Sequence, residues 1–187
     1  MSYKHLFNLN TNQQEKTATM VNHSGEIGAK QIYLGQIKAA KHCNLSQETI
    51  NDLIIMLESE LEHHQYFANK INSNTQFKPS VFDAIWKPFS FALGYASCFS
   101  SIQIAMLLTK QVETVIEKHY TEQLKELNLS SVDDNFIEKI TQFLADEMEH
   151  KHIGDEGSQN IHPHLKIVFE KLFTIIVQTA IYISSRV

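Results

Sequence analysis

The stretch Glu60-Leu61-Glu62-His63 returns later in the chain as Glu147-Met148-Glu149-His150. Both copies have the form Glu-x-x-His, which places a carboxylate and an imidazole on one face of a helix. Another glutamate stands thirty-four residues before each copy. The pattern therefore occurs twice at an offset of eighty-seven residues, and its six candidate metal ligands are Glu26, Glu60, His63, Glu113, Glu147 and His150. Four carboxylates and two imidazoles are the set that two metal ions require in a helix bundle.

Two helical hairpins explain this spacing. The chain has 6 glycines and 3 prolines among 187 residues, which favours long helices. At about 1.5 Å per residue, Glu26 lies roughly 24 Å before the end of its predicted helix, and Glu60 lies roughly 20 Å after the start of the next. Antiparallel arms of such similar length bring both residues to the same depth, and the same holds for Glu113 and Glu147. We therefore predict an all-α bundle with an internal two-fold duplication and one central layer of ligands.

The chain length suits a single domain over residues 1–187. We expect two halves and a terminal helix, at 13–72, 89–153 and 164–185. The predicted helices run over about 13–42, 46–71, 88–127, 136–153 and 164–185, with turns, linkers or loops at 43–46, 72–76, 128–134 and 154–163, and with a new segment starting at Pro79. The predicted N-caps are Ser46 and either Asp133 or Asp134. The inner positions expected on the first two helices are Ile27, Ala29, Ile32, Leu34, Ile37, Leu53, Ile54, Leu57, Leu61 and Tyr66.

Composition bears on the partners, the redox compartment and the targeting of the protein. A net charge of −5 and the lack of any Lys/Arg run argue against a nucleic-acid partner. Cys43 and Cys98 form neither a C-x-x-C motif nor a disulfide framework, which fits a reducing compartment. The first residues show no apolar or Arg-rich amphipathic stretch, so we expect neither a secretory signal nor a transit peptide.

Two segments carry no charged residue, Phe89 to Thr109 and Leu172 to Ser185. The first is long enough to span a bilayer. It contains several serines and Gln103, however, and Lys87-Pro88 directly precedes it. We therefore expect a buried or surface-lying helix there.

The duplication also selects among neighbouring candidates for the metal ligands. Glu149 and His152 form a third Glu-x-x-His, but the residues eighty-seven positions earlier are a glutamate and a glutamine. Glu117 corresponds to a lysine, whereas Glu113 corresponds to Glu26. Tyr33 and Tyr120 stand seven residues after their respective glutamates, on the same helical stripe. Tyr120 is accordingly our candidate catalytic residue near the metal site.

Gly28 and Gly35 share one face of the first predicted helix. Each lowers helix stability by roughly 1 kcal/mol relative to alanine. Two interpretations stay open: the small residues let a neighbouring helix or a flat substrate approach closely, or they are merely tolerated.

The ligand set indicates a type of metal but not one reaction. Carboxylates with imidazoles suit iron or manganese, and the lack of thiolates argues against zinc clusters and iron–sulfur centres. Six protein ligands leave coordination positions open on two ions held roughly 3.5–4 Å apart. Such a pair serves hydroxylation, radical generation or iron oxidation.

The residues around the ligands resemble the demethoxyubiquinone hydroxylase family. The likeness covers the chain from about residue 17, and the stretches that carry it are Asn22 to Ala29, Ile32 to Gln36, Glu60 to His63, Trp86 to Gly94, Val112-Glu113, Lys118 to Tyr120, Asp146 to His150 and Ala180 to Ser184. The resemblance implies a ferritin-like, membrane-associated protein with two iron ions held by the same six residues. It also implies hydroxylation of a polyprenylated demethoxy-benzoquinol ring in ubiquinone synthesis, with O₂ as co-substrate and an external reductant, for which NADH is the candidate.

This chain departs from the family at three positions near its ends. Met20 and Asn22 replace the Arg and Asp that are common before the Gly-Glu pair, and Gln178 replaces a common Arg in the terminal helix. These changes leave the ligands intact but affect groups that hold the reductant or the quinol head group. The alternative functions are a di-iron hydroxylase of another substrate, such as a modified tRNA base, and a ferritin-like ferroxidase or iron-storage protein.

A polyprenyl quinol stays in the membrane, so the active-site mouth is expected to dock there. We predict a monotopic attachment at the cytoplasmic face of the cell membrane. The residues expected to contact lipid are Trp86, Lys87, Phe89, Tyr95, Phe99 and Met106. The further partners we expect are a second copy of the chain or a complex of ubiquinone-biosynthetic proteins.

Overall fold

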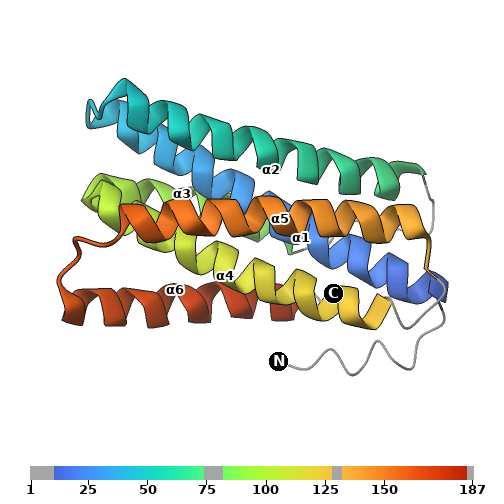
Figure 1. Ribbon diagram of the computed structural model, residues 1–187. Helices are drawn as coiled ribbons and strands as arrows, with labels where there is room; N and C mark the ends of the chain where they lie inside the picture. The colour runs from blue at the N-terminus through green and yellow to red at the C-terminus, as the bar shows by residue number, and fades with distance from the viewer. Residues whose placement is uncertain (1–10, 74–81, 128–131, 185–187) are drawn as a thin grey trace.

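A computed structural model describes residues 11–73, 82–127 and 132–184 of the chain, and every regular element in these ranges is an α-helix. The helices are α1 (Thr11–His42), α2 (Gln47–Ser73), α3 (Asp83–Ser100), α4 (Ile102–Leu127), α5 (Asp134–Gly157) and α6 (Pro163–Ser184). Figure 1 shows them running roughly along one common direction. The all-α prediction is confirmed. Of the linker expected at 72–76, residues 72–73 belong to α2 instead. Its remainder, Pro79 and residues 128–131 of the second turn lie outside the described ranges.

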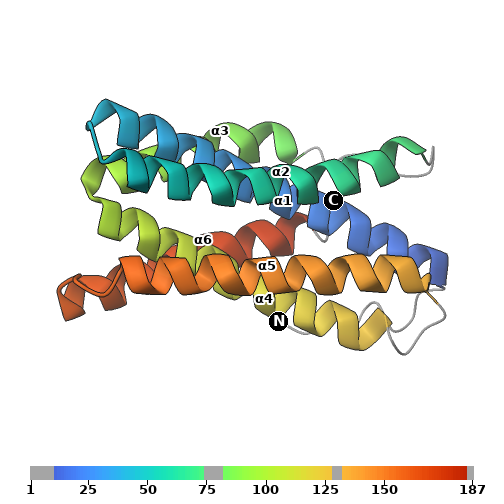
Figure 2. The ribbon, with the colours of Figure 1, turned by 45° about the horizontal axis from the view of Figure 1, so that its top comes forward.

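Four long helices form the bundle as two antiparallel hairpins, α1 with α2 and α4 with α5 (Figures 1 and 2). The first hairpin turns through Asn44, whose φ of 54° lies in the left-handed region. Ser46 then caps α2, because its Oγ accepts a hydrogen bond from the Thr49 amide at 3.2 Å. Asp133 caps α5 in the same way through the Asn135 amide at 3.1 Å. Both predicted caps are confirmed.

The third long helix predicted from Pro88 to Leu127 is wrong, because the chain forms two helices there. Pro88 lies inside α3, and the break falls instead at Ser101, whose extended backbone has φ −171° and ψ 156°. The Ser101 hydroxyl accepts a hydrogen bond from the Ile104 amide at 3.1 Å and so caps the start of α4. A serine in this position satisfies an amide that a continuing helix would have bonded internally. The uncharged segment Phe89 to Thr109 is therefore divided between two helices.

Two glycines let α3 pack directly on the backbone of α1. A Cβ added to Gly35 would lie 2.2 Å from the Phe91 carbonyl oxygen, and one added to Gly94 would lie 2.1 Å from the Ile32 carbonyl oxygen. No side chain fits at such distances, so only glycine permits this crossing. Gly28 is similar, since its added Cβ would meet the Trp86 indole at 2.2 Å. Of the two interpretations of these glycines, close approach of a neighbouring helix is confirmed.

Most positions predicted on the inner side of the first two helices are buried or half-buried, but Leu34 and Leu61 are not. Their exposed fractions are 37% and 45%. Leu61 directly follows Glu60, so it is turned by about 100° from the stripe that faces the bundle interior. That stripe holds the buried residues Glu60, His63 and Phe67. At this level of α2 the inner face therefore holds the candidate ligands, and the neighbouring Leu61 points outward.

Two of the residues predicted to contact a membrane lie in the interior. Trp86 is only 7% exposed, and its ring stacks between Phe82 and Phe89 with centroids 5.7 and 5.5 Å away. Met106 is buried as well. Trp86 is buried because Gly28 leaves room for the indole against α1. Phe89 and Phe99 are exposed, as predicted.

The terminal helix α6 has an apolar outer face. Its exposed residues Leu165, Val168, Leu172 and Ile175 follow one another at spacings of three and four, which places them on one stripe. Among the described helices, α6 alone is long and apolar enough to cross a membrane by length and composition, and 22% of its most apolar window is buried within the structure.

Candidate metal centre

All six predicted ligands meet in the centre of the bundle. They come from α1, α2, α4 and α5, and their exposed fractions range from 0% to 5%. Ligand atoms of Glu26, Glu60, His63 and Glu147 lie within 4.8 Å of one another, and so do those of Glu60, Glu113, Glu147 and His150. Glu60 and Glu147 belong to both groups. The arrangement therefore offers two adjacent sites that share two carboxylates, with one further Glu and one His for each.

The ligand atoms approach one another without forming hydrogen bonds. His63 Nδ1 lies 3.2 Å from a Glu147 oxygen, and His150 Nδ1 lies 3.2 Å from a Glu60 oxygen. These nitrogens, both oxygens of Glu60 and of Glu147, and one oxygen each of Glu26 and Glu113 have no hydrogen-bond partner although they are buried. Buried polar atoms are rarely left so. The donor set therefore fits metal ions, which such lone pairs would coordinate.

The electrostatics of the cluster show how strongly these groups interact. Burial alone would lower the pKa of His63, but Glu147 and Glu26 outweigh it and raise that pKa to about 12. His150 behaves alike, with a pKa raised to about 10 by Glu147 and Glu60 against burial. Burial raises the pKa values of Glu60 and Glu113 well above the usual range. So many buried carboxylates require positive charge among them, which imidazolium or metal ions supply.

Two buried tyrosines link the halves of the bundle. The Tyr33 hydroxyl of α1 donates to Glu113 of α4 at 2.7 Å. The Tyr120 hydroxyl of α4 donates to Glu26 of α1. Burial, and then the carboxylate that each one faces, raises the pKa of both tyrosines well above the usual value, so both stay protonated donors. Tyr120 thus lies beside the candidate ligands, where the sequence placed it, and Tyr33 is its counterpart in the other half.

One member of the site was not predicted as functional. Asp146 Oδ2 lies 3.1 Å from His63 Nε2, the nitrogen opposite the one that faces the other ligands. A carboxylate in this position orients a metal-binding imidazole and increases its basicity. Its position directly before Glu147 was visible in the sequence, but only the packing of α5 against α2 shows which imidazole it reaches.

The rejected alternatives lie outside the cluster. Glu117 accepts from Lys151 Nζ at 2.6 Å, as part of an ion pair between α4 and α5. Glu149 and His152 are exposed. The internal duplication therefore selected the residues that converge and excluded those that do not.

A neutral polar network lies next to Tyr120. Asn22 Oδ1 accepts from His119 Nε2 at 2.8 Å, and Asn22 Nδ2 donates to Gln123 at 2.9 Å. All three residues are buried. Burial lowers the pKa of His119 to about 4, so its imidazole is neutral at ordinary pH. Asn22, one of the three departures noted in the sequence, therefore contributes an uncharged amide to a network of uncharged groups.

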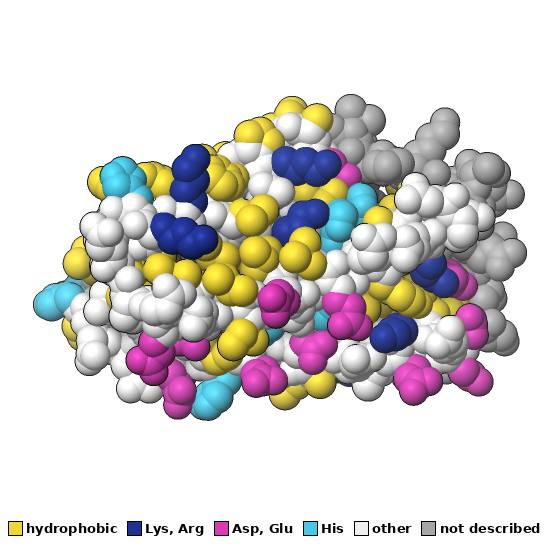
Figure 3. Space-filling view, turned by 90° about the horizontal axis from the view of Figure 1, so that it is seen from above, with side chains coloured by type: hydrophobic (Ala, Val, Ile, Leu, Met, Phe, Trp, Pro, Cys, Tyr) yellow, Lys and Arg dark blue, Asp and Glu magenta, His cyan; other side chains and the backbone are white. Residues whose placement is uncertain are grey.

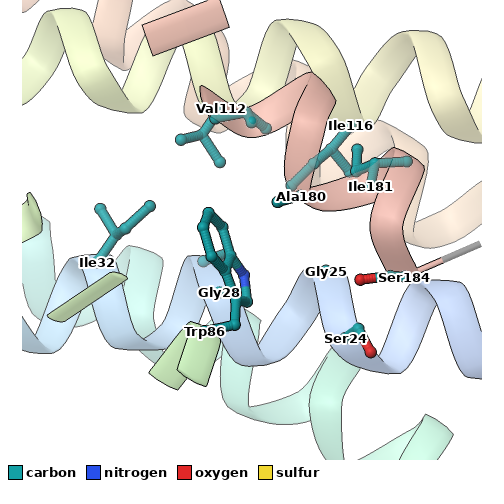
Figure 4. Close-up of a pocket in the computed structure, with 12 residues that line it drawn as sticks. Ser24, Gly25, Gly28, Ile32, Trp86, Val112, Ile116, Ala180, Ile181 and Ser184 are labelled. Atoms are coloured by element: carbon teal, nitrogen blue, oxygen red, sulfur yellow. The ribbon is translucent and has the colours of Figure 1, made fainter. Parts of the chain in front are cut away.

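An apolar cavity that is partly open to solvent lies between α1, α3, α4 and α6 (Figure 4). Trp86 stands beside Gly28 on one side of it, and Val112, Ile116, Ala180 and Ile181 lie across from α1. A smaller cavity shares Gly25, Ile116 and Ile181 with the first, and Glu26 and Tyr120 also line it. No atom outside the local backbone lies within 4 Å of a Cβ added to Gly25. The two cavities are therefore neighbours, and the smaller one borders a candidate ligand.

Comparison with known proteins gives a consistent family assignment. Residues 13–184 match the family described as "Ubiquinone biosynthesis protein COQ7". The chain is 36% identical over 168 residues to the NADPH-dependent 3-demethoxyubiquinone 3-hydroxylase, mitochondrial, of Dictyostelium discoideum, covering 89% of this chain and 75% of that protein. It is 29% identical to the 5-demethoxyubiquinone hydroxylase, mitochondrial, of Saccharomyces cerevisiae, with 89% and 76% covered. It is 28% identical to the 3-demethoxyubiquinol 3-hydroxylase of Rhodospirillum rubrum, with the same coverage.

Proposed function

This chain belongs to the COQ7 family of ubiquinone biosynthesis proteins, and on that premise we propose that it is a 3-demethoxyubiquinol 3-hydroxylase with two iron ions at its centre. The observation that carries the metal assignment is the pair of overlapping ligand groups that share Glu60 and Glu147. Shared carboxylates are what hold two ions close together in helix bundles.

We assign the ligands to two ions as the groups divide. Glu26 and His63 would hold one ion and Glu113 and His150 the other, and Glu60 and Glu147, which belong to both groups, would serve both. Carboxylates with one imidazole per ion suit iron, and a di-iron pair supplies the activation of O₂. Tyr33 and Tyr120 hold the two unshared glutamates by hydrogen bonds. Asp146 fixes the ring of His63.

The substrate that fits the cavities is an apolar molecule with a small polar ring. The larger cavity is lined mainly by aliphatic side chains and Trp86, which suit an isoprenoid tail. The smaller cavity reaches Glu26 and Tyr120, where the ring to be hydroxylated would lie. Apolar cavities beside the candidate ligands favour an organic substrate over iron storage.

The membrane contact is proposed at α6 and the exposed part of α3. The outer stripe of α6 carries Leu165, Val168, Leu172 and Ile175, and inner residues of the same helix line the larger cavity. A substrate entering from lipid would therefore meet α6 first, and we propose that the helix lies in one leaflet at the cytoplasmic face of the membrane. In vesicle flotation, Leu172→Ser with Ile175→Ser should lower the bound fraction. The same fraction as in the unchanged protein would exclude this surface.

The central experiment is complementation of a host that lacks this hydroxylase. The unchanged chain should convert accumulated demethoxyubiquinone to later intermediates, and the purified protein should contain two irons per chain. Glu147→Ala should abolish both, whereas Glu149→Ala, the same change two residues away on an exposed position, should abolish neither. Continued accumulation of demethoxyubiquinone with folded, iron-loaded protein would contradict the proposed function.

The reductant is proposed to be a reduced nicotinamide. The sequence suggested NADH, and the names of several relatives specify NADPH. Turnover measured with each nucleotide in turn separates the two.

A further inference from the structure

A cluster of basic side chains lies on the outer side of α1, between α2 and α3. Lys30 Nζ contacts His64 Nδ1 at 3.3 Å, and the His64 ring stacks on that of His23 with centroids 5.1 Å apart. Lys87 of α3 is near enough to act on both Lys30 and His64. Figure 3, which looks down on the α2 side of the bundle, shows Lys and His side chains next to one another there, with most Asp and Glu side chains along the opposite edge.

The charge of this cluster is not balanced. Lys70, Lys110 and Lys151 each pair with a carboxylate at 2.5–2.7 Å. Neither Lys30 nor Lys87 forms an ion pair with a carboxylate of the described residues. Burial, and then the charge of Lys87, lower the pKa of Lys30. A half-buried ammonium beside a second ammonium is unfavourable, and a bound anion would remove that cost.

The Asp83 carboxylate lies in the same region but is engaged elsewhere. It is buried, accepts from Ser24 Oγ at 2.7 Å and faces His23 Nδ1 at 3.7 Å. It therefore anchors the start of α3 to α1 beneath the cluster and leaves the two ammonium groups without a carboxylate partner.

The second half of the protein shows what this position normally holds. Eighty-seven residues after Lys30 and His64 stand Glu117 and Lys151, which form an ion pair at 2.6 Å between α4 and α5. The second half thus has its own carboxylate at this place. At the corresponding positions the first half has Lys30 and His64, and Lys87 adds a further cation.

We propose that Lys30, Lys87 and His64 form a binding site for a phosphate group of an anionic ligand. Two ammonium groups provide movable donors that match a compact, multiply charged phosphate rather than a planar carboxylate. His64 Nδ1 accepts from Lys30, so Nε2 carries the imidazole proton and is a third donor. The phosphate comes from a nicotinamide dinucleotide or from a phospholipid head group. The site uses neither the metal ions nor the quinol cavities, so failure of phosphate binding and failure of the hydroxylation are distinguishable, and only the nucleotide source rests on the proposed function.

The test measures binding of inorganic phosphate to the full-length, iron-loaded protein by calorimetry. The unchanged protein should bind it with saturation, and Lys30→Gln with Lys87→Gln should weaken binding about tenfold or more. The matched control is Lys38→Gln with Lys41→Gln, which removes the same amount of charge from α1 outside the cluster. Lys87→Gln alone should give an intermediate affinity. Because Lys87 is exposed, this result does not depend on how the Lys30 side chain packs.

Equal affinity in the two double variants, or no saturable binding to the unchanged protein, would overturn the proposal. Two further probes identify the source of the phosphate. Loss of NADPH affinity in the Lys30/Lys87 variant assigns the site to the nucleotide. Loss of flotation with vesicles of phosphatidylcholine and phosphatidylglycerol, but not with phosphatidylcholine alone, assigns it to a lipid. If the variant binds both NADPH and these vesicles as the unchanged protein does, the cluster is not a ligand site.

Discussion

His119 makes the stability of this protein depend on pH in a calculable way. Burial lowers its pKa to about 4, whereas a histidine in the unfolded chain titrates near 6.5. The unfolded state therefore binds more protons than the folded state between these two values. The stability that the neutral His119 contributes should be fully present above pH 6.5 and should be lost as the pH falls toward 4. The contribution of this one residue amounts to about 2 kcal/mol between about pH 7 and pH 5.

The measurement is denaturant unfolding at a series of pH values, with the free energy of unfolding plotted against pH. His119→Gln keeps a side-chain N–H that can reach Asn22 and removes the titration. We expect the variant to lose about 2 kcal/mol less than the unchanged protein over this range. Metal loss and the titration of the ligands affect both proteins, so the difference between the two curves isolates His119.

An exposed histidine provides the control. His164→Gln makes the same substitution at an exposed position, so it shows what replacing a histidine does outside the core. The reasoning fails if His119→Gln and the unchanged protein show the same loss of stability on acidification, because the buried imidazole would then take up its proton in the folded state.

Three further changes test the fold and the site. Gly94→Ala should destabilise the protein by about 1–3 kcal/mol through overpacking. Gly25→Ala, whose new Cβ meets no atom within 4 Å, should stabilise it by up to about 1 kcal/mol. Equal effects of the two substitutions in denaturant unfolding would contradict the packing of α3. Tyr33→Phe should cost about 1–3 kcal/mol by leaving the Glu113 oxygen unpartnered, and an unchanged unfolding midpoint would count against that bond. Glu113→Ala should lower the iron content measured by elemental analysis, whereas Glu117→Ala should retain it; the reverse result would refute the ligand assignment.

The sequence determined the two long hairpins and the residues that converge between them, because both depend on local or repeated patterns. Helical hairpins with equal arms place residues at equal depth, so the spacing of Glu26 from Glu60 was enough to align them. The serine and aspartate caps act within three residues of themselves. The duplication supplied a second, independent copy of the same information. The division of the chain into halves at 13–72 and 89–153 stays a prediction.

The tertiary structure decided which neighbours each helix meets, and no local pattern contains that. Trp86 has the composition of a membrane-boundary residue, yet the space left by Gly28 takes its ring into the interior. Ser101 ends α3 where the uncharged sequence suggested continuity, because its hydroxyl caps the next helix.

Contacts between distant segments likewise could not be read from local sequence patterns. Asp146 reaches His63 across eighty-three residues, and Tyr33 reaches Glu113 across eighty. Helix periodicity fixes which face a side chain occupies, but the angle and depth at which helices pack fix what that face touches. The sequence by itself therefore predicted the six residues that converge, and only their packing showed that Glu60 and Glu147 belong to both groups of candidate ligands.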